Sequence, residues 1–166
     1  MIDTQVLTTD DWALWRALRL AALADAPYAF AARLADWQGH GDREERWRAR
    51  LATPGSRQLV ARLDGEPAGM ASGVPGPQDD AVEVISLWVR PEARGKGVAD
   101  HLLHRLEEWT AQSAGARRLH LSVSPDNRAA LALYERNGFR DTGESGDPLP
   151  DGRTHRVLAK ALGGTR

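Results

Sequence analysis

VEVISLWVRPEARGKGVADHLL, residues 82–103, is the stretch on which the interpretation of the whole sequence depends. Its first half is an apolar run typical of a strand and breaks at Pro91, and its second half has helical periodicity after the turn at residues 94–97. A strand, a glycine-flanked basic turn and a helix N-terminus in this order are typical of an anion-binding site. The free backbone N–H groups and the helix dipole both favour negative charge there. The stretch therefore predicts a phosphate ligand.

Composition sets outer limits on the function. The 166 residues are most simply one domain, residues 1–166, and the formal charge of −1 argues against a general nucleic-acid partner. No apolar run approaches the roughly 20 residues that a membrane span needs, so we expect no membrane partner. The N-terminus lacks a signal-peptide pattern, which makes the cytoplasm the expected location. Cysteine is absent, so disulfides and thiolate metal sites are excluded.

Periodicity and turn signals give the expected order of elements, β-α-α-β-β-β-α-β-α-β-β. Asp64-Gly65 is a hairpin signal between two β-type runs, and Thr8 with Asp11 resembles a capping box before the first helix. We expect strands at 2–7, 57–63, 67–74, 82–89, 118–124, from 138 and at 153–160, helices at about 10–24, 42–53, 98–114 and from 126, and a loop at 144–152. This order favours an α+β, mixed three-layer α/β/α fold around a mostly antiparallel sheet.

Two familiar phosphate loops do not fit the glycine turn. The P-loop needs four residues between its glycines, and Gly95-Lys96-Gly97 lacks that spacing. The dinucleotide pattern G-x-G-x-x-G/A would place Asp100 at its last position, where a carboxylate hinders close packing and repels pyrophosphate. In the first helical turn Asp100 suits the dipole, but its side chain must point away from any phosphate.

Two motifs together carry a family resemblance. The first is Arg-x-x-Gly-x-Ala at residues 94–99, and the second is SPDNRAALALYERNGF at residues 124–139, with Asn127, Ala130, Tyr134 and Gly138-Phe139 at matching places. In this combination the sequence resembles the GNAT superfamily, the general-control-related N-acetyltransferases. The resemblance implies a sheet splayed between the strands at 82–89 and 118–124.

The resemblance also implies a cosubstrate, a reaction and site residues. Acetyl-CoA, without a metal, would donate its acetyl group to a primary amine by direct attack through a tetrahedral intermediate. The turn would hold the pyrophosphate by its backbone, strand backbone would pair with pantetheine and stabilise the oxyanion near Val89, and Tyr134 would protonate the leaving thiolate. The implied cofactor-binding residues are Leu87, Trp88, Val89, Arg94, Gly95, Lys96, Gly97, Val98, Ala99 and Asn127.

Glu83 is the candidate base, with alternatives. Strict alternation puts its carboxylate in an apolar row with Ile85, Leu87 and Val89. One account is a β-bulge that rotates part of the run; another is a base at the cleft whose pKa is raised by burial; a third is an edge residue in a salt bridge. His120 or a water chain could serve as the base in its place.

The acceptor is the least defined part. Phe30 and Trp37 lie in an irregular segment and are our candidates for substrate contact. By resemblance, the acceptor is a small-molecule or peptide amine, although Ser122 stands where some relatives that modify protein N-termini carry Glu. Dimerisation is common among similar proteins, so a homodimer is also expected. The rival hypothesis is a non-catalytic module that binds or senses acyl-CoA.

Overall fold

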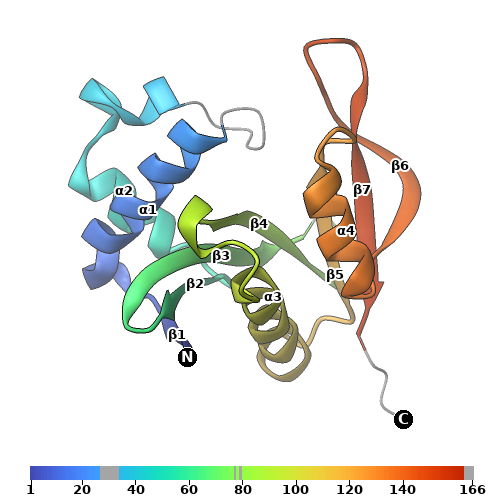
Figure 1. Cartoon of the computed structure of the whole chain (residues 1–166), viewed down its shortest axis with the longest axis horizontal. Coiled ribbons are helices and arrows are strands. Elements are labelled where there is room, and N and C mark those ends of the chain that lie inside the picture. Colours follow the sequence, from blue (N-terminus) through green and yellow to red (C-terminus); the bar gives the residue numbers. More distant parts are fainter. Residues whose placement is uncertain (27–33, 77, 79, 163–166) are drawn as a thin grey trace.

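The computed structural model describes residues 1–26, 34–76, 78 and 80–162, and builds them around one seven-stranded sheet with the order β1-β2-β3-β4-β5-β7-β6 (Figure 1). All neighbouring strands are antiparallel except β4 and β5. The strands are β1 (Ile2–Val6), β2 (Arg57–Leu63), β3 (Glu66–Pro75), β4 (Ala81–Val89), β5 (Arg118–Val123), β6 (Arg140–Pro148) and β7 (Thr154–Ala161). The helices are α1 (Trp12–Asp25), α2 (Glu44–Leu51), α3 (Val98–Trp109) and α4 (Arg128–Arg136). The expected fold class and element order are confirmed.

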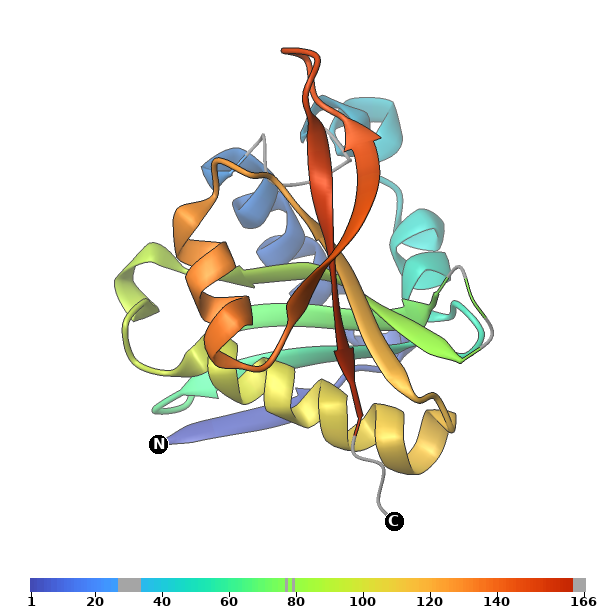
Figure 2. The same ribbon diagram turned by 90° about the vertical axis from the view of Figure 1, so that its right-hand side faces the viewer.

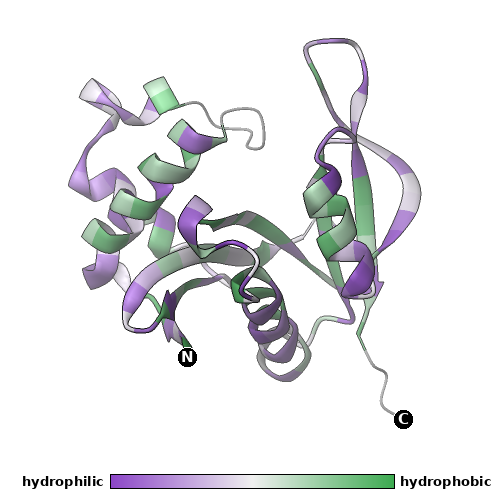
Figure 3. Cartoon of the chain, viewed as in Figure 1, coloured by the Kyte–Doolittle hydropathy of each residue, from purple (hydrophilic) through white to green (hydrophobic). Residues whose placement is uncertain are grey.

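Helices cover both faces of the sheet. In Figure 2, α3 lies below strands β2–β4, and α1 and α2 lie on the opposite side. Two apolar clusters correspond to these faces: one packs Leu102 and Leu106 of α3 against β2–β5, and the other packs Trp15 and Trp47 against Met70 and Trp88. Figure 3 shows the consequence, with hydrophilic residues on the outward turns of α3 and along much of β6.

The capping box and the hairpin turn that the sequence predicts are both present. Thr8 and Asp11 form the capping box: Thr8 N donates to Asp11 Oδ2 at 2.8 Å, and Asp10 N donates to Thr8 Oγ1 at 3.3 Å. The hairpin between β2 and β3 turns on Asp64 and Gly65, whose φ values of 52° and 89° both lie in the left-handed region. Two left-handed residues in a two-residue loop match the right-handed twist of the strands.

A β-bulge in β4 changes the alternation expected for Glu83. Met70 pairs with Trp88 but Ser72 pairs with Ile85, so β4 has one residue more than β3 between these pairs, and Ser86 adopts φ 59°. Val82, Val84, Leu87 and Val89 consequently all contact the cluster around α3. The predicted row of Glu83 with Leu87 and Val89 is therefore wrong, because the bulge turns the second half of the strand over.

The sheet splays between β4 and β5. Only Ala81, Val82 and Glu83 pair with β5, opposite Arg118, Leu119 and His120. From Val84 onward β4 keeps its β3 neighbour, while β5 continues along β7 to Val123, and Figure 1 shows the two strands diverging. At the far edge, β6 runs to Pro148 with two register shifts, so the loop expected at 144–152 is shorter and 144–148 are strand.

Candidate active site

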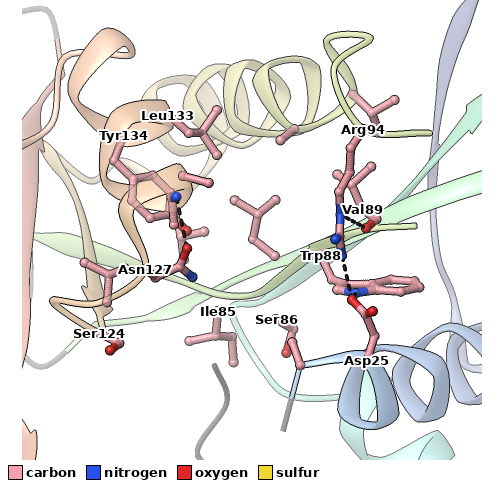
Figure 4. Close-up of a pocket in the computed structure, with 18 of the residues that line it drawn as sticks. Asp25, Ile85, Ser86, Trp88, Val89, Arg94, Ser124, Asn127, Leu133 and Tyr134 are labelled. Atoms are coloured by element: carbon pink, nitrogen blue, oxygen red, sulfur yellow. Dashed lines mark hydrogen bonds and ion pairs between the residues drawn. The ribbon is translucent and has the colours of Figure 1, made fainter. Parts of the chain in front are cut away.

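The splay opens into a cleft of about 1000 Å³ that contains most of the predicted site residues. Its floor is the second half of β4, one wall is α4 with the end of β5, and the other wall comes from α1, α2 and the turn before α3 (Figure 4). Past Glu83, no strand of the described ranges lies beside the edge of β4 that faces the cleft. Such an edge offers backbone N–H and C=O groups to an extended ligand containing amides.

The glycine turn forms one end of this cleft. Gly95 and Gly97 have φ values of 77° and 87°, a backbone conformation that glycine adopts without strain, and Gly97 is the N-cap of α3. No heavy atom lies within 4 Å of a Cβ built on Gly95, so the backbone can be approached closely. The first intrahelical bond runs from His101 N to Gly97 O at 3.0 Å, which leaves the preceding N–H groups of the helix pointing out of its end.

Arg94 lines the cleft, and its guanidinium bonds to α1 and to the end of β4. Arg94 Nη2 donates to Asp25 Oδ2 at 2.6 Å, and Arg94 Nε donates to the Val89 carbonyl at 3.0 Å. The same Asp25 oxygen accepts a bond from Trp88 Nε1 at 3.0 Å (Figure 4). The Trp88 and Arg94 hydrogen bonds lower the pKa of Asp25. The guanidinium thus fastens α1 to the end of β4, and the implied role of Arg94 in cofactor binding stays a prediction.

Helix α4 brings Asn127 and Tyr134 to the opposite wall. Asn127 is the N-cap of α4, and its Oδ1 accepts a bond from Ala130 N at 3.1 Å, which leaves the amide N–H₂ as a donor. Tyr134 is 8% exposed and packs edge-on against Phe139, with ring centroids 5.7 Å apart. Burial raises the pKa of the Tyr134 phenol to about 12. The phenol is therefore protonated at neutral pH, so it can act as a general acid but not as a general base.

Asp100 points away from the turn, as the sequence required. Its carboxylate accepts bonds from Arg136 Nε at 3.1 Å, Arg136 Nη2 at 2.9 Å and Asn137 Nδ2 at 2.8 Å. The Arg136 bond, followed by the Asn137 bond, lowers the pKa of Asp100 despite partial burial. The first turn of α3 is thereby tied to the C-terminal end of α4.

Glu83 lies at the vertex of the splay, in the last residue pair of β4 with β5. Burial raises the pKa of its carboxyl group, and the charge of Asp147 adds to this effect, although His120 opposes it. A carboxyl group with a raised pKa is better matched to accept a proton near neutral pH. His120 is 9% exposed, its Nδ1 is buried without a hydrogen bond, and it does not line the cleft, whereas His155 of β7 does.

The cleft gathers most, but not all, of the predicted residues. Trp37 lines the cleft and packs against Trp47, with ring centroids 4.5 Å apart. Lys96, in the glycine turn, is exposed and does not line the cleft. Phe30 lies outside the described residues. Arg19 and Arg50 also line the cleft and were missed. A signal was present for Arg19, because it falls within the apolar stripe of Trp15, Leu18 and Ala22, where a charge is unexpected.

The described ranges of residues contain neither a membrane-spanning helix nor a group of metal-ligating side chains. No helix there is both long and apolar enough to cross a membrane. Nor do three or more His, Asp or Glu side chains gather in those ranges as they would around a metal ion.

Comparisons with known proteins agree with this architecture. The model of the Acetyltransferase (GNAT) family matches residues 15–139. An IAA acetyltransferase of Azospirillum brasilense is 36% identical over 101 residues, which are 61% of this chain and 65% of that protein. An acetyltransferase of the GNAT family from Streptococcus pneumoniae superposes with a TM-score of 0.77 at 20% identity, over 98% of this chain and 100% of that one. The PaiA N-acetyltransferase of Thermoplasma acidophilum, solved with coenzyme A, superposes with a TM-score of 0.75 at 17% identity, over 97% of this chain and 99% of that one.

The splayed α/β sheet with a helix N-terminus at its cleft is the fold of these solved structures. The chain belongs to the Acetyltransferase (GNAT) family, since the family model covers most of its length. The match to the Azospirillum relative spans about two thirds of that protein.

Proposed function

We propose that this protein is an N-acetyltransferase that transfers an acetyl group from acetyl-CoA to a primary amine. The observation that carries the proposal is the convergence of three features on one cleft: an open helix N-terminus behind Gly97, the unpaired edge of β4, and the buried phenol of Tyr134. These are the features needed to hold a diphosphate, a chain of amides and a departing sulfur. The coenzyme A bound to the Thermoplasma neighbour supports the same ligand class.

The residues present fit coenzyme A. The turn at Gly95 and Gly97 receives the diphosphate on backbone N–H groups, with Val98 and Ala99 in the first turn of α3. The edge formed by Leu87, Trp88 and Val89 pairs with the pantetheine amides, and Asn127 donates its amide N–H₂ from across the cleft. The thioester oxygen accepts hydrogen bonds, so backbone N–H groups of this edge near Val89 are its donors.

When bound, acetyl-CoA supplies an activated acyl group on sulfur. Glu83, directly or through water, removes the proton that the acceptor ammonium must lose before its nitrogen can form the new C–N bond. As the C–S bond breaks, Tyr134 donates its proton to the sulfur. Glu83 stands on strand β4 and Tyr134 on helix α4, so the proton that the amine loses and the proton that the sulfur gains are handled by two different residues of the cleft.

The rival function is binding of acyl-CoA without transfer. The two hypotheses are separated by an acetylation assay with a panel of amines, followed by release of free thiol, on the wild type and on Tyr134→Phe. Transfer by the wild type, with kcat reduced roughly 100-fold in Tyr134→Phe and unchanged affinity for coenzyme A, is the expected result. Tight coenzyme A binding by calorimetry with no thiol released on any amine would establish the sensor.

Other features of the proposal rest on the sequence. We expect the reaction in the cytoplasm, on small-molecule or peptide amines, with neither nucleic acid nor membrane as a partner, in a single domain. A homodimer likewise stays a prediction.

A further inference from the structure

Two basic side chains line the cleft on the side of α1 and α2, opposite the acidic side chains that β4 and β6 contribute. Arg19 of α1 and Arg50 of α2 line it together with Trp37. Burial and, after it, the charge of Arg50 lower the pKa of the Arg19 guanidinium to about 10, so Arg19 remains cationic at neutral pH, and burial also lowers the pKa of Arg50. These two like charges therefore lie close enough to repel each other. Figure 1 shows α1 and α2 on one side of the opening and β6 and β7 on the other.

Among the residues that the structure describes, no carboxylate pairs with Arg50. Its Nη2 donates to the hydroxyl of Ser72 at 3.3 Å, and its guanidinium lies 5.5 Å from the ring centroid of Trp15. Its Nη1 is buried and makes no hydrogen bond, and Arg50 forms no ion pair within the described residues. A buried cation normally has a counter-ion, because an unpaired buried charge is costly.

The same helix shows that unpaired arginine is not the rule here. Arg48, two residues earlier, pairs with Glu44 at 2.8 Å and with Asp10 at 3.3 Å. Arg16, one turn before Arg19, pairs with Asp42 at 2.5 Å. These outward-facing arginines have acidic partners, whereas Arg50 faces the cleft without one.

The acidic side chains of the cleft lie apart from these two arginines. Glu83 interacts electrostatically with His120 and Asp147, and neither arginine contributes to the shift in its pKa. Asp147 and His155 line the cleft from β6 and β7, opposite α1 and α2. A ligand spanning the cleft would thus meet positive charge at one end and negative charge at the other.

We propose that the acceptor is an amine that also carries a carboxylate. The carboxylate pairs with the Arg50 guanidinium, with Arg19 adding charge, and the amine faces Glu83. This inference rests on the proposed function, since it names the substrate class of the same site. It predicts that amino carboxylic acids are preferred over polyamines and over uncharged amines.

Matched acceptors test the carboxylate directly. Glycine, β-alanine and 4-aminobutyrate are compared with glycinamide, β-alaninamide and 4-aminobutanamide at saturating acetyl-CoA. The amides have the more readily deprotonated amines, so a preference for the acids cannot arise from the amine. We expect kcat/KM at least about tenfold higher for the acid in the pair of best length, as one charge-assisted hydrogen bond would give. Equal or higher kcat/KM for all three amides would overturn the inference.

Variants locate the preference. Arg50→Gln should abolish the acid–amide difference by raising KM for the acid, with KM for acetyl-CoA unchanged, and Arg50→Lys should keep part of it. Arg43→Gln is the control, because Arg43 is an exposed arginine just before α2, paired with Glu45 and absent from the cleft lining. An acid preference that survives intact in Arg50→Gln would reject the assignment. Thermal melts of each variant show whether the fold is retained.

Binding separates this inference from the proposed function. Calorimetry of the acid and amide series on the coenzyme A complex needs no turnover. If the acids bind and Arg50→Gln removes that binding while no amine is acetylated, the carboxylate site stands and the transferase proposal fails. If amines are acetylated but neither rate nor binding distinguishes acids from amides, the carboxylate site fails alone.

Discussion

Arg94 and Asp25 lie 69 residues apart in sequence, yet the Arg94 guanidinium is 2.6 Å from the Asp25 carboxylate. The pair joins the turn before α3 to the last residue of α1, and Trp88 shares the same oxygen. Three elements that line the cleft therefore meet at one carboxylate.

Asp25→Asn should weaken this junction while retaining an acceptor for Trp88. Both partners are partly exposed, so we expect a loss of about 1 kcal/mol in the free energy of unfolding at pH 7. The pKa of Asp25 is lowered in the folded protein, so its stabilisation is present above the ordinary pKa and is lost as the pH falls through the lowered value. Urea unfolding at pH 7 and at pH 3 should show the difference from wild type shrinking, and an equal difference at both would contradict this. Asp10→Asn, on an exposed carboxylate, is the control.

Ionisation of the Tyr134 phenol should not lower kcat at any pH below about 10. Its pKa is raised to about 12 by burial, so it stays protonated well beyond neutrality. We expect kcat to be flat from pH 8 to 10 in the wild type, and Tyr134→Phe to lower it by a constant factor across that range. A basic limb that disappears in Tyr134→Phe would show that the phenol titrates there instead.

Glu83→Gln should act on rate and stability in opposite directions. The raised pKa of the folded carboxyl group places the acidic limb of kcat/KM above the ordinary value for glutamate, and Glu83→Gln should remove that limb and lower the plateau roughly 100-fold. A raised acid pKa means that stability declines as the pH rises from the ordinary value through the raised one. Glu83→Gln should therefore melt higher than wild type at pH 8 and equally at pH 4. A lower melting temperature at pH 8 would mean that the ionised carboxylate is stabilised instead, as in a salt bridge.

Ser86 should respond to backbone rather than side-chain chemistry. Its φ of 59° costs a β-branched residue far more than glycine. We expect Ser86→Val to lose about 2 kcal/mol in chemical denaturation, and Ser86→Gly to stay within about 1 kcal/mol because relieved strain offsets added chain entropy. Equal losses for both variants would show that the serine hydroxyl, not the bulge, is what matters.

Gly97→Ala should separate ligand binding from helix stability. Gly97 has φ 87°, and the nearest side-chain atom to a Cβ there is Ile2 Cδ1 at 4.0 Å, so the cost is conformational, about 1 kcal/mol. Gly115→Ala is matched, since Gly115 has φ 68° in open space at the other end of the same helical segment. Both should lower the melting temperature similarly, but only Gly97→Ala should weaken coenzyme A binding in calorimetry. Equal coenzyme A affinities would place the diphosphate elsewhere.

Much of this fold follows from local chemistry. The Asp64-Gly65 hairpin and the Thr8 capping box each depend on residues within four positions of one another, and the sequence predicts both. The Ser86 bulge could be raised only as one account of Glu83, because it is fixed by the register between β3 and β4.

The site is less visible in the sequence because its charges are assigned by tertiary contacts. The Arg94 side chain has the composition of a phosphate ligand, but a carboxylate from α1 reaches it first. Arg50 sits two residues from Arg48, and nothing local distinguishes the paired arginine from the unpaired one. Such assignments require knowing which helices face each other across the sheet.

The bond between Asp100 and Arg136 has a mechanical consequence. Three residue pairs join β4 to β5, at one end of the splay, so beyond them the spacing of the two strands is set by packing and by helix contacts and not by a hydrogen-bonded ladder. Asp100 and Arg136 tie the first turn of α3 to the C-terminal end of α4, and Arg136 is two residues beyond Tyr134. In the proposed enzyme, this ion pair would help to fix the distance between the turn that receives the diphosphate and the phenol that protonates the sulfur.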